Sequence, residues 1–221
     1  MNYFTQDFLK FFKELEKNNN REWFNKNKSR YEESVKKPFE AFITELIRRI
    51  HDEDPNINTN PKDSIFRIYR DVRFSPDKRP YKTHASAVIS AGGRKDMRDP
   101  GHYIELSAKE IRFYGGLYMI EKNDLQMIRE HIAANTARFN KLIGDKKFKK
   151  VFGKMLGEQN KRIPPEFKEA YEKQPLIANK QFYFFAKLDT KELPNKKLTD
   201  KLMNFYKVAK PINNFLKQAL R

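Results

Sequence analysis

One short stretch of the chain, Ser64–His84, holds residues whose types and spacing could bind a charged ligand. Five cationic side chains fall within thirteen residues and a sixth follows: Arg67, Arg70, Arg73, Lys78, Arg79 and Lys82. Guanidinium groups match phosphate or carboxylate oxygens with two parallel hydrogen bonds, and an ammonium adds a point charge. Two carboxylates, Asp71 and Asp77, lie among the cations, and apolar residues alternate with them. This pattern predicts a binding site, because a core strand would not carry so many charges.

The main functional hypothesis is recognition of a phosphate- or carboxylate-bearing small molecule. The expected ligand-binding residues are Arg67, Arg70, Arg73, Lys78, Tyr81 and Lys82. On a strand, Arg67 and Arg73 share one face with Asp71, which could orient a guanidinium. The alternative is an internal salt-bridge network, in which the cations are neutralised by the protein itself. In that case Arg70 would pair with a helix carboxylate, and the candidates are Glu22, Glu32 and Glu33.

A third hypothesis is an enzyme that acts on a phosphorylated substrate. The candidate catalytic residues are His84, Tyr81 and Asp71, with His84 or Tyr81 transferring the proton. A hairpin neighbour could bring His102 close to His84. The four histidines show no metal-ligand spacing, so neither a metal nor another cofactor is expected. The chain also has no cysteine nucleophile, no G-x-S-x-G sequence and no phosphate-binding P-loop.

The distribution of charge supports a second hypothesis, in which the partner is a nucleic acid. The net charge is +17, and residues 141–221 contribute 20 basic and 8 acidic residues to it. A basic region of this size could bind nucleic acid without sequence preference, or it could simply reflect a lysine-rich composition. The aromatic stretch QFYFFAKL could stack bases, but its four consecutive aromatics are better explained as a core strand.

The hydrophobic pattern predicts an α+β fold, with an antiparallel sheet of about four to five strands packed by N- and C-terminal helices. Apolar residues recur with a period near 3.6 up to Ile50, and a break or kink is expected where Lys37 precedes Pro38. From Ile65 the period changes to two. The expected strands are Ile65–Asp71, His84–Ala91, His102–Ser107, Ile111–Tyr118 and Gln181–Leu188.

The C-terminal half returns to the helical period. A capping box formed by Asn123 and Gln126 predicts a helix that ends at Gly144. Two closing helices are expected, with Pro211 separating them. Gly115 and Gly116 inside the fourth strand predict a bulge or a close approach of another backbone.

The whole chain is expected to form one domain over residues 1–221. Residues 1–60 are the helical scaffold, residues 61–120 the meander with the cationic stretch, and residues 121–221 a mostly helical, basic region. The chain has no cysteine, no secretion signal and no apolar run long enough to span a membrane. A cytoplasmic protein without a membrane partner is therefore expected, and its oligomeric state stays open.

The cationic stretch also carries a resemblance to a known family. Seven of its residues fit the pattern RxxRDxRFxxxKxxY: Arg67, Arg70, Asp71, Arg73, Phe74, Lys78 and Tyr81. This pattern, together with NNNREWF near the N-terminus and Tyr114–Tyr118, resembles a widespread bacterial family of uncharacterised proteins, domain-of-unknown-function family 2461. The resemblance covers most of the chain and implies a single α+β domain. It implies no activity.

Overall fold

The computed structural model describes residues 2–221, and the chain begins with helices. The N-terminal helices are α1 (Gln6–Lys17), α2 (Arg21–Lys26), α3 (Lys28–Tyr31), α4 (Lys37–Glu53) and the short α5 (Pro61–Ser64). Thr5 caps α1 by accepting a hydrogen bond from the Asp7 N–H, and Asn20 caps α2 in the same way through the Trp23 N–H. Both caps agree with the sequence pattern.

A π-helical turn, Glu32–Lys36, joins α3 to α4 in place of the break expected at Pro38. The Lys37 N–H donates to the carbonyl of Glu32, five residues earlier. Pro38 falls in the first turn of α4, where its missing N–H would have no partner in a helix anyway. Of the two alternatives expected here, a break or a kink, the break does not form, because the wider turn lets the chain pass the proline while it stays helical.

Four antiparallel strands form one sheet in the order β1-β2-β3-β4. They are β1 (His84–Ile89), β2 (His102–Ser107), β3 (Ile111–Leu117) and β4 (Phe182–Leu188). In β2, buried Ile104 and Leu106 alternate with half-exposed Tyr103 and Glu105, as the period of two predicts. The α+β class is confirmed.

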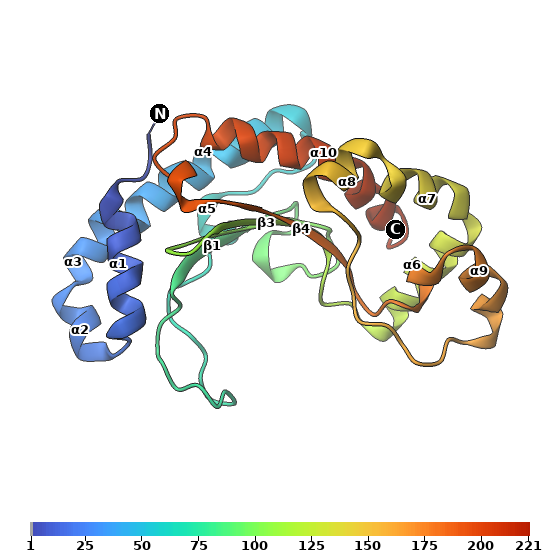
Figure 1. The fold of residues 1–221 in the computed structure, drawn as a ribbon, viewed down its shortest axis with the longest axis horizontal. Helices are drawn as coiled ribbons and strands as arrows, with labels where there is room; N and C mark the ends of the chain where they lie inside the picture. Colours follow the sequence, from blue (N-terminus) through green and yellow to red (C-terminus); the bar gives the residue numbers. More distant parts are fainter. Residues whose placement is uncertain (1) are drawn as a thin grey trace. The chain divides into compact units, whose positions relative to one another are not determined.

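The strand expected at Ile65–Asp71 was wrong. This segment forms only isolated antiparallel bridges, between Ile65 and Ala87 and between Tyr69 and Tyr81. A regular strand beside β1 would have to continue through Arg70, Asp71 and Arg73, whose charges are better placed in water. The chain leaves the sheet edge instead and runs as a long loop between α5 and β1 (Figure 1).

The remaining elements are mostly helical. They are η2 (Gly93–Lys95), α6 (Lys122–Ala134), α7 (Thr136–Gly144), α8 (Lys146–Phe152), η3 (Pro165–Phe167), α9 (Lys168–Lys173), η4 (Pro175–Ala178), η5 (Thr190–Glu192) and α10 (Leu198–Gln218). The single helix expected up to Gly144 is divided at Asn135, and the expected capping box does not form. Instead, α6 begins after Glu121, whose side chain makes no capping hydrogen bond.

Pro211 lies inside α10 and does not end it. The two closing helices expected from the sequence are therefore one. Its buried positions continue across the proline, from Tyr206 and Ala209 to Ile212 and Phe215. A proline in a helix interior costs roughly 3 kcal/mol, and the burial of this continuous apolar stripe offsets that cost.

Contacts between residues divide the chain into two compact units. The first unit contains the residues up to Arg94, Tyr103–Phe113 and Lys187–Met203. The second contains Lys95–His102, Tyr114–Ala186 and Asn204–Arg221. The expectation of one domain over residues 1–221 stays a prediction.

Each unit has its own aromatic core. In the first, Phe42 packs edge-on against Phe4 at 5.2 Å between ring centres. In the second, Phe184 packs against Phe148 and Phe152 at 5.0 and 4.7 Å. The second unit also contains the close approach expected at the paired glycines. Gly116 has φ +92°, and a Cβ there would lie 2.1 Å from the carbonyl oxygen of Phe182.

Candidate functional site

The long loop before β1, residues 65–83, contains all six cations of interest and is called the signature loop here. Its base is tied to β1, since the Phe66 N–H donates to the carbonyl of Ser86 at 2.9 Å. Its two arms are tied to each other, since the Lys82 N–H donates to the carbonyl of Ile68 at 2.8 Å. The first unit therefore holds the base of this loop in place and leaves the part between Arg70 and Arg79, the loop tip, extending beyond it.

Tyr81 anchors the loop base in the core. Its ring is buried and stacks on Phe24 with 4.1 Å between ring centres. The Asn19 side chain also pairs with the Tyr81 backbone in both directions, at 2.9 and 3.0 Å. Burial raises the pKa of the Tyr81 hydroxyl, so this group is protonated at neutral pH. Tyr81 was expected to be a ligand-binding or catalytic residue. In the structure, its ring packs the loop against α2.

The arginines of the loop tip are paired within the loop. Arg70 and Arg79 share Asp77, at 2.8 and 2.7 Å, and Arg73 pairs with Asp71 at 2.7 Å. The expected partners of Arg70 on the helices were wrong, because a carboxylate seven residues away lies closer. Those three helix carboxylates each pair with a lysine four residues along: Glu22 with Lys26, Glu32 with Lys36 and Glu33 with Lys37.

These pairs change the titration of the two aspartates. The hydrogen bonds from the Arg73 side chain and backbone lower the pKa of Asp71 to about 2. Those from Arg79, with a further contribution from Arg70, lower the pKa of Asp77 well below its usual range. Both aspartates are therefore ionised at neutral pH and engaged with arginine, which leaves Asp71 positioning Arg73.

Two other features complete the loop tip. Lys78 Nζ donates to the carbonyl of Val72 at 3.1 Å, which closes the turn. Phe74 is 93% exposed at the outer end of the loop, with the Arg73 guanidinium 5.8 Å from its ring centre. The tip is a hairpin-like turn in which each arginine is paired with an aspartate of the same loop, while Lys78 donates to backbone carbonyls.

The two cations at the loop base are different. Lys82 is half-buried, forms no ion pair among the described residues, and places its ammonium 5.0 Å from the centre of the Phe66 ring. Burial lowers the pKa of Lys82, and the nearby Arg67 lowers it further, while Glu105 acts in the opposite direction. Arg67 also forms no ion pair within residues 2–221. Arg67 and Lys82, the cationic pair, are therefore close to each other without being neutralised.

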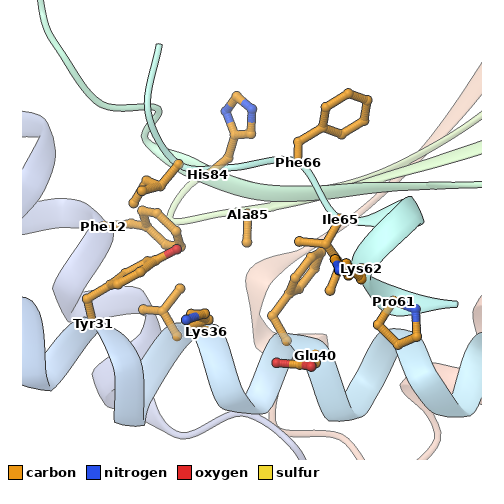
Figure 2. A pocket seen from close by; sticks show the side chains of 13 residues that line it. Phe12, Tyr31, Lys36, Glu40, Pro61, Lys62, Ile65, Phe66, His84 and Ala85 are labelled. Atoms are coloured by element: carbon orange, nitrogen blue, oxygen red, sulfur yellow. The ribbon is translucent and has the colours of Figure 1, made fainter. Parts of the chain in front are cut away.

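Beside Lys82, the face of the sheet that points away from α4 carries a group of polar side chains. Figure 2 shows the His84 ring pointing away from the helix, whereas Ala85 points toward it. His84 Nε2 lies 3.6 Å from Glu105 Oε2, and the Tyr103 hydroxyl donates to the same oxygen at 3.1 Å.

Arg112 reaches this group from β3. Its Nη1 lies 3.9 Å from the other oxygen of Glu105. Arg112 also pairs with Glu110, which accepts a second ion pair from Lys187 at 2.9 Å. The sheet-face cluster consists of Lys82, His84, Tyr103, Glu105 and Arg112.

His84 is neutral in this environment. Burial is the main cause that lowers the pKa of its imidazole. Glu105 opposes that effect, and Lys82 and Arg112 add to it. A neutral imidazole beside a carboxylate and a phenol hydroxyl has the composition of a general acid–base group.

Sequence reasoning found Lys82 and His84 but missed three partners. Tyr103, Glu105 and Arg112 were not among the expected site residues, although they lie on strands that the sequence predicts. The alternation along β2 and β3 would have placed all three on one sheet face. The expected neighbour of His84 was His102, whereas the side chain found beside it is Glu105.

The described residues contain no group of three or more His, Asp or Glu side chains arranged to hold a metal ion. Within the same residues, no helix has both the length and the apolar composition needed to cross a membrane.

Two comparisons with known proteins place the chain. The search of the curated proteins found no match to it. The family described as "Conserved hypothetical protein (DUF2461)" matches residues 7–215, which include the signature loop and every strand of the sheet. The match extends over nearly the whole chain, so this protein belongs to the DUF2461 family of conserved hypothetical proteins.

Proposed function

We propose that the protein binds a small molecule bearing a phosphate or carboxylate group at the cationic pair, Arg67 and Lys82. The observation that carries this proposal is that Lys82 is half-buried and has no ion-pair partner in the part of the chain that the structure describes. Partial burial removes water from the ammonium, and a neighbouring guanidinium adds repulsion. A bound anion offsets both costs.

The loop tip supports this assignment by contrast. Its arginines have carboxylates at 2.7 to 2.8 Å, so an incoming anion would have to displace an existing partner. At the base an anion meets no such competitor. Arg67 offers a planar fork with several donors, and Lys82 offers a compact charge, which is a combination suited to phosphate oxygens.

The surroundings of the cationic pair also favour an anion. Arg112 and Lys187 lie on the same region of the first unit, where they share the carboxylate of Glu110. With Arg67 and Lys82 they make four cations. The carboxylates near them are Glu105, Glu110 and Asp71, and Asp71 is already paired with Arg73. The excess of positive charge on this face attracts an anion over a distance of about 8–10 Å at physiological salt.

A second candidate function is catalysis of a proton transfer on the bound anion. The contact between His84 and Glu105 favours it, because the carboxylate can orient the imidazole beside the ligand. In this hypothesis Lys82 and Arg67 hold the phosphate group while His84 accepts or donates a proton. Hydrolysis of a phosphate ester that is lost in His84→Gln, with phosphate binding retained, would support it.

The test is the melting temperature of the protein in sodium phosphate, with ionic strength kept constant by sodium chloride. Ligand at about 100 times its dissociation constant stabilises a protein by about 2.7 kcal/mol. For a chain of this size, each kcal/mol raises the melting temperature by about 2–4 °C. We expect this rise in the wild type, a smaller rise in Arg67→Gln and, in Lys82→Met, only the rise that phosphate gives without specific binding.

Arg73→Gln is the matched control, since it removes a cation of the same loop that is already paired. It should keep the full response to phosphate. An equal response in all four proteins would contradict the proposal, because phosphate also stabilises proteins without specific binding. Strongly salt-dependent binding of nucleic acid that survives Lys82→Met would instead favour the basic C-terminal region.

A further inference from the structure

We propose that a pocket in the first unit binds a small, mostly apolar molecule that carries one hydrogen-bonding group. The pocket has a volume of about 230 Å³ and lies between the helical segment Tyr31–Glu40 and the start of β1. Ile65 and Ile68 of the signature loop line it, together with α5. His84 of the sheet-face cluster also borders it, but the imidazole points away from the interior (Figure 2), so this proposal rests on other side chains than the proposed anion site.

The walls of the pocket are apolar. Phe12, Val35, Phe39, Ile65 and Ala85 contribute to them. Figure 2 shows Tyr31 and Phe12 at one end, Pro61 and Lys62 at the other, and the methyl group of Ala85 pointing in from β1. The rings of His84 and Phe66 point away from the interior. An apolar lining of this kind favours an apolar ligand, because water inside it finds few partners.

Tyr31 supplies the polar group. Its hydroxyl points toward the interior in Figure 2 and forms no hydrogen bond within residues 2–221. Burial raises the pKa of Tyr31, and the carboxylate of Glu32 raises it further, so the hydroxyl stays protonated at neutral pH. It can therefore donate to a ligand oxygen or accept from a ligand N–H or O–H.

The charged residues at the pocket do not require a charged ligand. Lys36 is already paired with Glu32 at 2.8 Å. Glu40 and Lys62, which are of opposite sign, both line the opening. The polar recognition inside the pocket is therefore a hydrogen bond, and the ligand's charge contributes little to it.

The π-helical turn shapes one wall. Val35 and Lys36 belong to this turn, and both line the pocket. A π turn holds its peptide groups in a less favourable geometry than an α-helix, and such turns occur frequently at functional sites. Here the turn begins at Glu32, directly after Tyr31.

The volume limits the size of the occupant. A cavity of about 150 Å³ lined by apolar residues is enough to bind benzene. A pocket of about 230 Å³ accepts one substituted ring or a branched chain of similar size. A helix of a partner protein, about 10 Å across with its side chains, is too large for it.

The experiment is titration of the full chain with phenol and with toluene, followed by NMR of the methyl groups of Val35, Ile65, Ile68 and Ala85. Phenol matches the expected ligand, and toluene has the same shape without the hydroxyl. We expect both to shift these methyl signals, with phenol binding roughly threefold to tenfold more tightly because of one additional hydrogen bond. Tyr31→Phe should make the two affinities equal.

Ala85→Leu should abolish binding by filling the pocket. The control is Ala134→Leu, which adds the same atoms at an exposed position of α6. If Ala85→Leu does not fold, the comparison of phenol with toluene in Tyr31→Phe still decides the question. The proposal is overturned if phenol leaves the four methyl signals unchanged near its solubility limit. That result would favour a side chain of a partner protein as the occupant of the pocket.

Discussion

The tip and the base of the signature loop both contain cationic side chains. The arginines at the tip are ion-paired, whereas the cations at the base have no ion-pair partner among the described residues. At the tip, Arg73 and Arg79 are exposed and Arg70 is half-buried, and all three are ion-paired with two aspartates. At the base, Lys82 is half-buried beside Arg67, and neither has an ion-pair partner among the described residues. All three arginines of the tip are therefore ion-paired, although its cations outnumber its two aspartates, whereas Arg67 and Lys82 at the base have no ion pair among the described residues.

This difference shows that the density of cations in a sequence does not by itself locate an anion site. Arginine two residues after aspartate, as in Asp71–Arg73 and Asp77–Arg79, pairs locally without help from the fold. Pairs of this kind on a surface are worth little in stability. The base cations meet only because the two arms of the loop return to the same edge of β1.

The largest expected difference between the two regions is in stability. Tyr81→Ala removes a buried ring that stacks on Phe24, and such truncations cost about 3–5 kcal/mol. Phe74→Ala removes a ring that is 93% exposed, and we expect a change within about 0.5 kcal/mol. Urea unfolding of both variants measures the two costs. Similar losses in both would mean that the loop tip is packed in solution.

The next largest expected effect concerns the pKa values of the two aspartates at the loop tip, Asp71 and Asp77. Asp71 should titrate at about 2, well below its ordinary value of 3.8, and Asp77 lower still. Because both pKa values are lowered in the folded state, the stabilisation is complete above the ordinary value and is lost as the pH falls toward 2. NMR of the carboxyl carbons measures both values. Arg73→Gln should return Asp71 toward 3.8, and titration of wild-type Asp71 near 3.8 would refute the pairing.

The smallest expected effect concerns the pKa of Lys82 at the loop base. Its pKa is lowered from 10.5, so the folded state holds this proton less tightly than the unfolded chain. The contribution of Lys82 to stability therefore rises with pH between the lowered value and 10.5. NMR of the isotopically dimethylated lysine follows it. Arg67→Gln and added phosphate should each raise the pKa, and a value that responds to neither would separate Lys82 from the anion site.

Much of the fold was predictable because it depends on local pattern. The period of two located β1 to β3, the aromatic composition of QFYFFAKL located β4, and the amphipathic period located the N-terminal helices. The failures have a common cause. At Pro38 and Pro211 the local preference is for a break, but a π turn in one case and a continuous buried stripe in the other keep the chain helical. At Ile65–Asp71 the alternation was present, but its charges did not fit a sheet.

The amino-acid sequence by itself determined the α+β class, the family and the stretch in which the cations gather. Only the tertiary structure decided which of those cations are neutralised, and that Glu105 and Arg112 join His84 from neighbouring strands. The reason is physical: hydrogen bonds between near neighbours follow from spacing along the chain. Burial, and with it the energy of an unmatched charge, depends on which distant segments the fold brings together.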